Sequence, residues 1–205
     1  MKKFLVLMVV VSAFLLCKET SWALTFPIVA GEQVTMANDG TVPYTLIDGG
    51  VTYQTFCLES TNYFSPGSTY YVGSVGDNAI KGNVADPAGD PVNTESKWLY
   101  AAFMEGLLGD KTNSLALLVQ KAIWGFENEI GGDLTEWNNK YNAIYLANQN
   151  ILNHWTIKAV NLTNQAGTAD YQSQLVGVVP EPAAMLLLGT GLMGLAFSTR
   201  RRIKK

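Results

Sequence analysis

Two apolar segments, one near each end of the chain, limit the part of this sequence that can fold in water. The first covers residues 4–16, begins after Lys2 and Lys3, and is followed by the small-residue site Ser21-Trp22-Ala23. A basic start, an apolar run and a small-residue site are the three parts of a secretory signal peptide. We therefore predict a signal peptide over residues 1–23, with cleavage after Ala23.

The second apolar segment lies at residues 183–198 and contains no charged side chain. It is at the short end for a membrane-spanning helix, and its glycines do not stop a helix in lipid. A basic tail over residues 200–205 follows it and begins with Arg200, Arg201 and Arg202. Because basic residues stay on the cytoplasmic side, the segment predicts a transmembrane helix that leaves the middle of the chain outside.

The middle of the chain, residues 24–178, is long enough for one domain with a sizeable core. It contains six lysines, no arginine and fifteen acidic residues, and so carries a net charge near −9. This charge disfavours binding to nucleic acid, which needs a basic surface. Cys17 leaves with the predicted signal peptide, so Cys57 is the one cysteine of residues 24–178 and no internal disulfide is expected.

The first half of this middle segment has the pattern of β structure. Runs rich in Thr, Tyr, Val and Phe at residues 41–47 and 51–58 are separated by the turn signal Asp48-Gly49-Gly50. Residues 60–96 are dense in Gly, Pro, Asn, Ser and Asp, which predicts a long surface excursion with one strand-like piece at 70–75.

The second half predicts helices followed by strands. Helical patterns cover residues 95–108, 114–129 and 134–154, with Gly109 and Gly131-Gly132 as stop signals for the first two. Strand-like segments at 155–162 and 171–179 follow and should return to the sheet. The whole pattern predicts an α+β fold, a single domain of antiparallel strands with a helical insertion of about three helices.

The C-terminal segment combines the motif Val179-Pro180-Glu181-Pro182, the apolar run and the arginine cluster. Together they resemble the PEP-CTERM sorting signal of Gram-negative, often biofilm-forming bacteria, over residues 179–205. The resemblance implies the export machinery and an exosortase-like processing enzyme as partners. It also implies a protein that is anchored in the inner membrane before processing and then moves to the cell surface or the extracellular matrix. An ordinary tail anchor that begins with Pro-Glu-Pro is the alternative.

Two short boxes in the middle segment carry a second resemblance. Phe56-Cys57-Leu58-Glu59 is followed some sixty residues later by Val119-Gln120-Lys121-Ala122-Ile123-Trp124. The pair resembles the cysteine and glutamine boxes of the thioester domains in Gram-positive surface adhesins. The resemblance implies an internal thioester between the Cys57 sulfur and the Gln120 side-chain carbonyl, with Phe56, Glu59 and Trp124 as supporting residues. It further implies covalent capture of a lysine or another amine on a partner, for adhesion or crosslinking.

The sequence also allows a plainer function. A lone cysteine at a strand end is usually a small buried apolar residue, and a glutamine on a helix is usually solvated. The alternative is therefore a passive structural matrix protein with a free, buried Cys57.

Conventional enzyme activity is not expected. His154 is the only histidine, which excludes a histidine triad and a multi-histidine metal site within one chain. Glu127 and Glu129 are expected to lie on a solvated face rather than to act as a catalytic pair. We expect no turnover, no metal and no cofactor.

Overall fold

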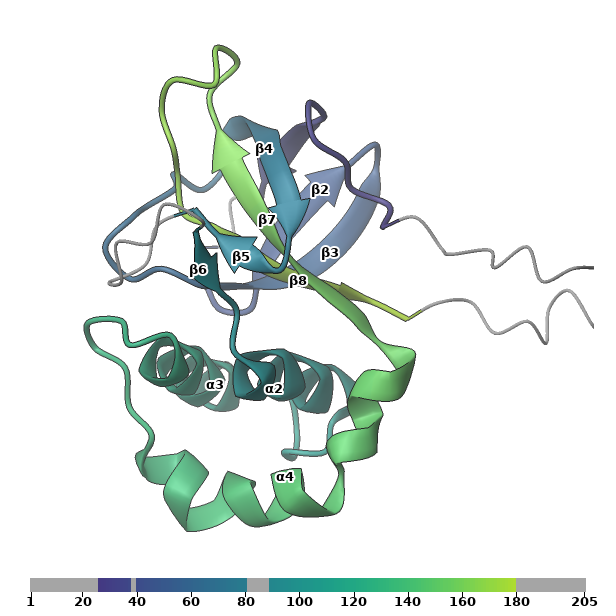
Figure 1. The fold of residues 1–205 in the computed structure, drawn as a ribbon, viewed down its shortest axis with the longest axis vertical. Coiled ribbons are helices and arrows are strands. Elements are labelled where there is room, and N and C mark those ends of the chain that lie inside the picture. Colours follow the sequence, from purple (N-terminus) through teal and green to yellow (C-terminus); the bar gives the residue numbers. More distant parts are fainter. Residues whose placement is uncertain (1–25, 38–39, 81–88, 180–205) are drawn as a thin grey trace, which may run out of the picture.

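The computed structural model describes residues 26–37, 40–80 and 89–179 (Figure 1). The predicted signal peptide, the motif residues 180–182, the predicted transmembrane segment 183–198 and the basic tail lie outside these described residues. Within the described ranges, none of the helices has both the length and the apolar composition that crossing a bilayer requires.

A six-stranded antiparallel barrel forms the upper half of the molecule in Figure 1. Its strand order is β1-β2-β3-β8-β7-β4, and it closes where β4 pairs with β1. Closure leaves its strands without the unpaired edge that an open sheet has to protect. The prediction of antiparallel strands is confirmed. The strands are β1 (Gln33–Met36), β2 (Tyr44–Asp48), β3 (Val51–Cys57), β4 (Thr69–Gly76), β7 (Thr156–Thr163) and β8 (Gln174–Val178).

The tight turn between β2 and β3 follows from its two glycines. Gly49 and Gly50 both have positive φ, 53° and 87°, a conformation that glycine adopts at little cost. Two such residues in succession give the twist that suits a two-residue hairpin, here closed by the pair Asp48 and Val51. This turn was correctly predicted from the sequence.

The strand-like piece predicted at residues 70–75 is confirmed as β4, but the prediction that it lies within a surface excursion over residues 60–96 was wrong. That strand pairs with β1 on one side and with β7 on the other, so it is a full member of the barrel. A β-bulge shifts the register of β4 between Val72 and Ser74, where the strand has a glycine. A small two-stranded sheet, β5 (Asn78–Ala79) with β6 (Asp90–Pro91), follows β4.

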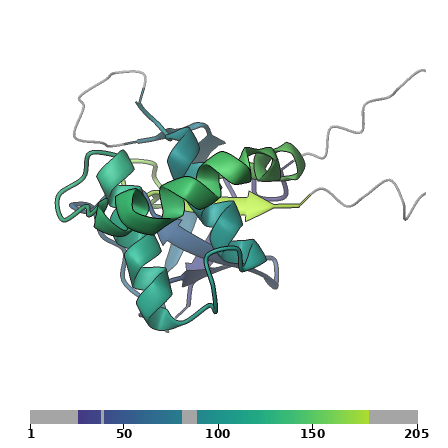
Figure 2. The same cartoon turned by 90° about the horizontal axis from the view of Figure 1, so that it is seen from below.

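Helices cover one side of the barrel, as Figures 1 and 2 show from two directions. α2 (Thr94–Glu105) ends at Gly106, whose φ of 76° gives the left-handed residue that commonly follows a helix. The predicted end at Gly109 was therefore three residues late. α3 (Asn113–Phe126) begins after Thr112, whose hydroxyl accepts a hydrogen bond from the Leu115 N–H.

The third predicted helix, over residues 134–154, is broken into three pieces. They are a π-helical turn η1 (Trp137–Tyr141), a short α4 (Asn142–Ala147) and a 3-10 turn η2 (Gln149–His154). Six asparagines fall in this stretch, and asparagine competes with helix formation by bonding to nearby backbone groups. One of them, Asn148, separates α4 from η2.

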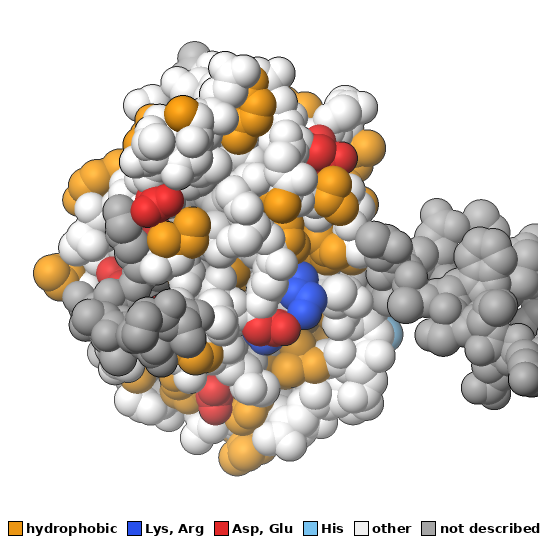
Figure 3. Space-filling view, turned by 45° about the horizontal axis from the view of Figure 1, so that its top comes forward, with side chains coloured by type: hydrophobic (Ala, Val, Ile, Leu, Met, Phe, Trp, Pro, Cys, Tyr) orange, Lys and Arg blue, Asp and Glu red, His pale blue; other side chains and the backbone are white. Residues whose placement is uncertain are grey.

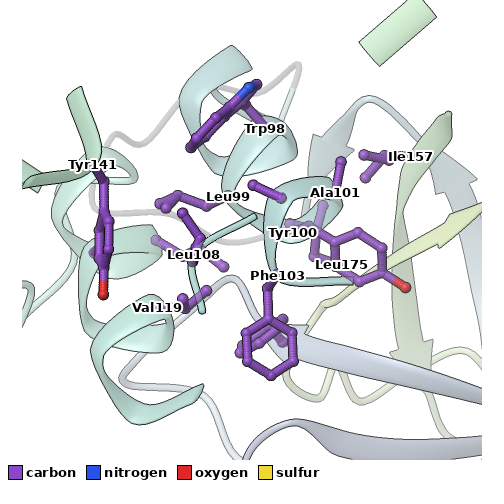
Figure 4. Close-up of a cluster of buried hydrophobic side chains, with 14 of the residues drawn as sticks. Trp98, Leu99, Tyr100, Ala101, Phe103, Leu108, Val119, Tyr141, Ile157 and Leu175 are labelled. Atoms are coloured by element: carbon purple, nitrogen blue, oxygen red, sulfur yellow. The ribbon is translucent and has the colours of Figure 1, made fainter. Parts of the chain in front are cut away.

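Two apolar cores result from this arrangement. One fills the barrel with residues such as Met36, Leu46 and Leu162. The other lies between the helices and the outer side of the barrel, where the α2 residues Tyr100 and Ala101 lie close to Ile157 of β7 and Leu175 of β8 (Figure 4). The hydroxyl of Tyr100 also donates a hydrogen bond to the Gln54 carbonyl at 2.9 Å, which fixes α2 to β3.

Basic side chains are few on the face shown in Figure 3. Lys97 and Lys158 both form ion pairs with Asp77, each at 2.8 Å. Two of the six lysines of residues 24–178 therefore share one carboxylate.

Candidate functional site

The side chain of Gln120 lies against the backbone of Cys57. The Cys57 N–H donates to Gln120 Oε1 at 2.8 Å, and Gln120 Nε2 donates to the Cys57 carbonyl at 2.7 Å. Both residues are 1 % exposed. The two residues that the resemblance pairs are thus in direct contact across 63 positions of sequence.

The strand pattern explains why the Cys57 backbone is available to a side chain. β2 begins at Tyr44, opposite Thr55, so β3 continues two residues beyond its β2 neighbour. On the other side, Leu58 N–H donates to the Ser173 carbonyl, so alternation turns the N–H and C=O of Cys57 away from β8. The Gln120 amide fills the gap and satisfies backbone groups that would otherwise be buried and unpaired.

α3 carries Gln120 on a buried face that is wider than the sequence indicated. The sequence places Gln120 beside the apolar stripe, next to Ala116 and Glu127. In the structure Ala116, Gln120 and Glu127 are all buried, together with Val119 and Ile123 of the stripe itself. Gln120 is therefore an interior glutamine rather than a solvated one.

Phe56, the first of the predicted supporting residues, belongs to the core between α2 and the barrel. Its ring is fully buried and meets Tyr100 and Phe103 edge to face, with ring centroids 6.2 and 5.3 Å apart. Because Phe56 and Cys57 are adjacent in β3, their side chains lie on opposite faces of the strand. Phe56 therefore anchors β3 to α2.

Glu59 joins the end of β3 to the start of β8. Its carboxylate accepts hydrogen bonds from Ser173 N at 2.8 Å and Ser173 Oγ at 2.9 Å, and its carbonyl accepts one from Gln172 Nε2. The side chain is 2 % exposed. Through these bonds Glu59 sets the position of β8 relative to Cys57.

Trp124 lies one helical turn beyond Gln120 on α3 and is partly exposed. Its indole N–H is buried and has no acceptor among the described residues. An unpaired buried N–H is unusual in a native protein.

The Cys57 sulfur has a neighbour that the sequence did not reveal. Gln174 of β8 lies opposite Cys57, with Nε2 3.7 Å and Oε1 4.0 Å from Sγ. Burial raises the pKa of the Cys57 thiol far above its ordinary value, the Gln174 hydrogen bond lowers it, and the charge of Glu59 raises it. The thiol is therefore protonated at neutral pH. Gln174 was missed because its pairing with Cys57 depends on the β3–β8 register, which no local pattern encodes.

Glu127 and Glu129 are buried, contrary to the solvated face that was predicted for them. Asn93 donates to Glu127 from its backbone N at 3.1 Å, and Ser60 donates to Glu129 from its N and Oγ, both at 2.8 Å. Burial raises the pKa of Glu127. The two carboxylates thus hold separate loops against the end of α3.

Metal ligands do not gather anywhere in residues 26–37, 40–80 and 89–179. No group of three or more His, Cys, Asp or Glu side chains there is arranged to hold an ion. His154 pairs with Glu105 on the surface at 2.8 Å.

Comparison with known proteins finds a sorting motif at the C-terminal end of the chain. The PEP-CTERM protein-sorting motif matches residues 178–202. The motif implies an exported protein that is held at the membrane and then processed by an exosortase. The predicted sorting signal over 179–205 is thereby confirmed. No curated protein matches the chain. No solved structure matches it either, so the resemblance of the middle segment to thioester domains has no support from these comparisons.

Proposed function

We propose that the exported domain forms an internal thioester between Cys57 and Gln120 and uses it to capture an amine on a partner molecule. The observation that carries the proposal is the pair of hydrogen bonds between the Gln120 amide and the Cys57 backbone. These bonds hold the Gln120 side-chain amide against the backbone of Cys57, and this proximity supports the proposal. The domain would then act as a single-use adhesin or crosslinker at the cell surface or in the extracellular matrix.

The chemistry needs no cofactor. The Cys57 sulfur adds to the side-chain carbonyl carbon of Gln120, the C–N bond breaks, and the thiol proton leaves with the nitrogen as ammonia. Negative charge develops on Gln120 Oε1 as the sulfur adds, and the Cys57 N–H already donates to that atom at 2.8 Å. A hydrogen bond directed at the developing charge lowers the barrier to such a step.

Burial would preserve the bond once it has formed. Cys57 and Gln120 are almost inaccessible, and Phe56 and Leu58 beside the cysteine are buried as well. Exclusion of water protects a reactive acyl group from hydrolysis. Capture would then consist of attack by a primary amine on the same carbon, with the amide formed and the Cys57 thiol released.

A biotin-linked primary amine tests this proposal. The full chain, expressed in a Gram-negative host that exports it, is incubated with the probe, and the labelled peptide is identified by mass. We expect the probe on Gln120 in the wild-type chain and no label in the Cys57→Ala chain. The exposed Gln149 serves as an internal control for unspecific labelling. Equal labelling of wild-type and Cys57→Ala chains, or none in either, contradicts the proposal.

A passive structural role is the second candidate, and one observation favours it. The Gln120 amide fills the backbone gap beside β3, which is a sufficient reason for a buried glutamine at this position. In that case Cys57 stays a free thiol, and the labelling experiment gives no product on Gln120.

A further inference from the structure

A groove lies at the start of β7, where this strand extends past the end of β4. β4 ends at Gly76, which pairs with Ala159, so within the described part of the chain residues 156–158 of β7 are paired with β8 alone. The groove, called the β7 groove below, has a volume of about 250 Å³. It is lined by Lys97 of α2, Leu152 of η2, Trp155, and the first three residues of β7, Thr156, Ile157 and Lys158.

The β7 groove carries a surplus of positive charge in an acidic domain. Lys97 and Lys158 line it, and both pair with the single carboxylate of Asp77 at 2.8 Å. Two lysines against one aspartate leave one positive charge unmatched, whereas residues 24–178 as a whole have a net charge near −9. The β7 groove therefore favours an occupant that carries a carboxylate.

The remaining wall of the β7 groove is largely apolar. Leu152 and Trp155 are both partly exposed there. Trp155 Nε1 donates to Glu105 at 2.8 Å, and the same carboxylate oxygen contacts His154 Nε2, so both the polar atom of the indole and this acidic group already have partners. Grooves with an aromatic wall commonly bind proline-rich segments, which lose little conformational entropy because their φ angles are already fixed.

The chain itself supplies such a segment beside the β7 groove. Thr156 pairs with Val178, the last residue of β8, and Figure 1 shows the end of β8 beside the start of β7. Only Val179 separates β8 from Pro180-Glu181-Pro182. The free side of β7 is two strand spacings from β8, roughly 10 Å, and three extended residues span about the same distance. So short a tether gives an effective concentration in the millimolar range, at which weak binding is sufficient.

We propose that the β7 groove binds Pro180-Glu181-Pro182 of the same chain before the chain is processed. The Glu181 carboxylate lies at the two lysines, and the prolines lie against the apolar wall. A bound motif is withheld from the exosortase, so the β7 groove slows processing of the sorting signal at residues 178–202. This inference does not depend on the proposed thioester.

A water-soluble carbodiimide, which joins a carboxylate to a lysine amine in direct contact, tests the binding. The full chain is produced in a Gram-negative host that lacks an exosortase, and crosslinked peptides of the monomer are identified by mass. We expect Glu181 to be joined to Lys97 or Lys158 in wild type, and no such crosslink in Glu181→Gln. The crosslinks of Asp77 to the same lysines should form in both chains and show that the reagent works. Lys140, which is exposed, should not be joined to Glu181.

The rate of processing provides the second measurement. In a host with an exosortase, we expect Lys158→Glu to be processed at least about twofold faster than wild type, because a motif that is bound half of the time is available for the other half. Lys140→Glu is the matched control, since this exposed lysine does not line the β7 groove, and it should be processed like wild type. Thr156→Glu adds a carboxylate to the β7 groove without removing a lysine, and it replaces Lys158→Glu if that chain fails to fold.

Three crosslinking results overturn the inference: no crosslink of Glu181 to either lysine while those of Asp77 form, crosslinks that reach Lys140 equally, or crosslinks found only between two chains. Equal rates of processing for wild type and a folded Lys158→Glu or Thr156→Glu chain also overturn it. These results leave the proposed Cys57–Gln120 bond standing, because neither measurement involves it.

Discussion

Gln120 completes the hydrogen bonding of the Cys57 backbone, giving one bond to its N–H and one to its carbonyl, at 2.8 and 2.7 Å. The same contact has two consequences. It satisfies buried backbone groups where β2 ends, and it holds an amide carbonyl next to the cysteine. Because the structural role and the proposed thioester need the same geometry, only a chemical measurement distinguishes them.

Amine treatment should lower the stability of the chain. A Cys57–Gln120 bond closes a loop of 63 residues, and a covalent link of that span stabilises the folded state by about 4 kcal/mol through the entropy of the unfolded chain. Methylamine opens the link, so the free energy of unfolding in urea should fall by about this amount. The Cys57→Ala chain is the control and should not respond. Equal loss in both chains would mean that methylamine acts elsewhere.

Glu127 should make the stability depend on pH. Burial raises the pKa of its carboxyl group in the folded chain above the ordinary value of 4.5. The stability that this group contributes is therefore fully present below the unfolded pKa and is lost as the pH rises through the folded pKa. Relative to wild type, the Glu127→Gln chain should become more stable as the pH rises from about 4 to about 7. Urea unfolding at several pH values measures this difference.

Asp77 provides the control with the opposite sign. Lys158 and Lys97 lower the pKa of its carboxyl group, so its contribution is present above the unfolded pKa and is lost as the pH falls. Asp77→Asn should therefore lose stability relative to wild type as the pH rises through the acid range. A Glu127→Gln profile that runs parallel to wild type would show that Glu127 does not titrate abnormally.

Gly177 should not tolerate a side chain. It lies in β8 beneath α2, where a Cβ atom would overlap Tyr100 Cε1 and come within 3.0 Å of Ile157 and Trp155. Overpacking of this kind costs about 1–3 kcal/mol, so Gly177→Ala should lower the melting temperature by several degrees. Gly76→Ala is the matched control because nothing lies within 4 Å of its added Cβ. Equal stability of the two variants would show that α2 packs less closely on β8 than described.

Local patterns predicted the parts of the fold that local chemistry determines. Asp48-Gly49-Gly50 requires positive φ at two successive positions, which glycine supplies, so the β2–β3 hairpin could be predicted. The apolar stripe of α3 gave that helix its position within three residues at either end. The closure of the barrel by β1 and β4 was not predictable, since it depends on pairing between distant segments.

The candidate site also contains residues that the sequence could predict and residues that it could not. The motifs around Cys57 and Gln120 could be recognised in the sequence because each is a contiguous run of residues. Gln174 could not be found, because it reaches the sulfur only through the β3–β8 register. The bond that Thr55 donates to Gln174 depends on the same register. The burial of Glu127 and Glu129 was also missed, since their partners Asn93 and Ser60 lie in loops far away in the sequence.

The intact mass of the exported chain tests the central claim most directly. Wild type should be lighter than the mass of its sequence by one ammonia, and methylamine treatment should add one whole methylamine to this lighter chain. Cys57→Ala and Gln120→Ala should each show the full mass of their sequences before and after treatment. A wild-type chain with its full unmodified mass, and with a Cys57 thiol that labels on unfolding, would contradict the thioester.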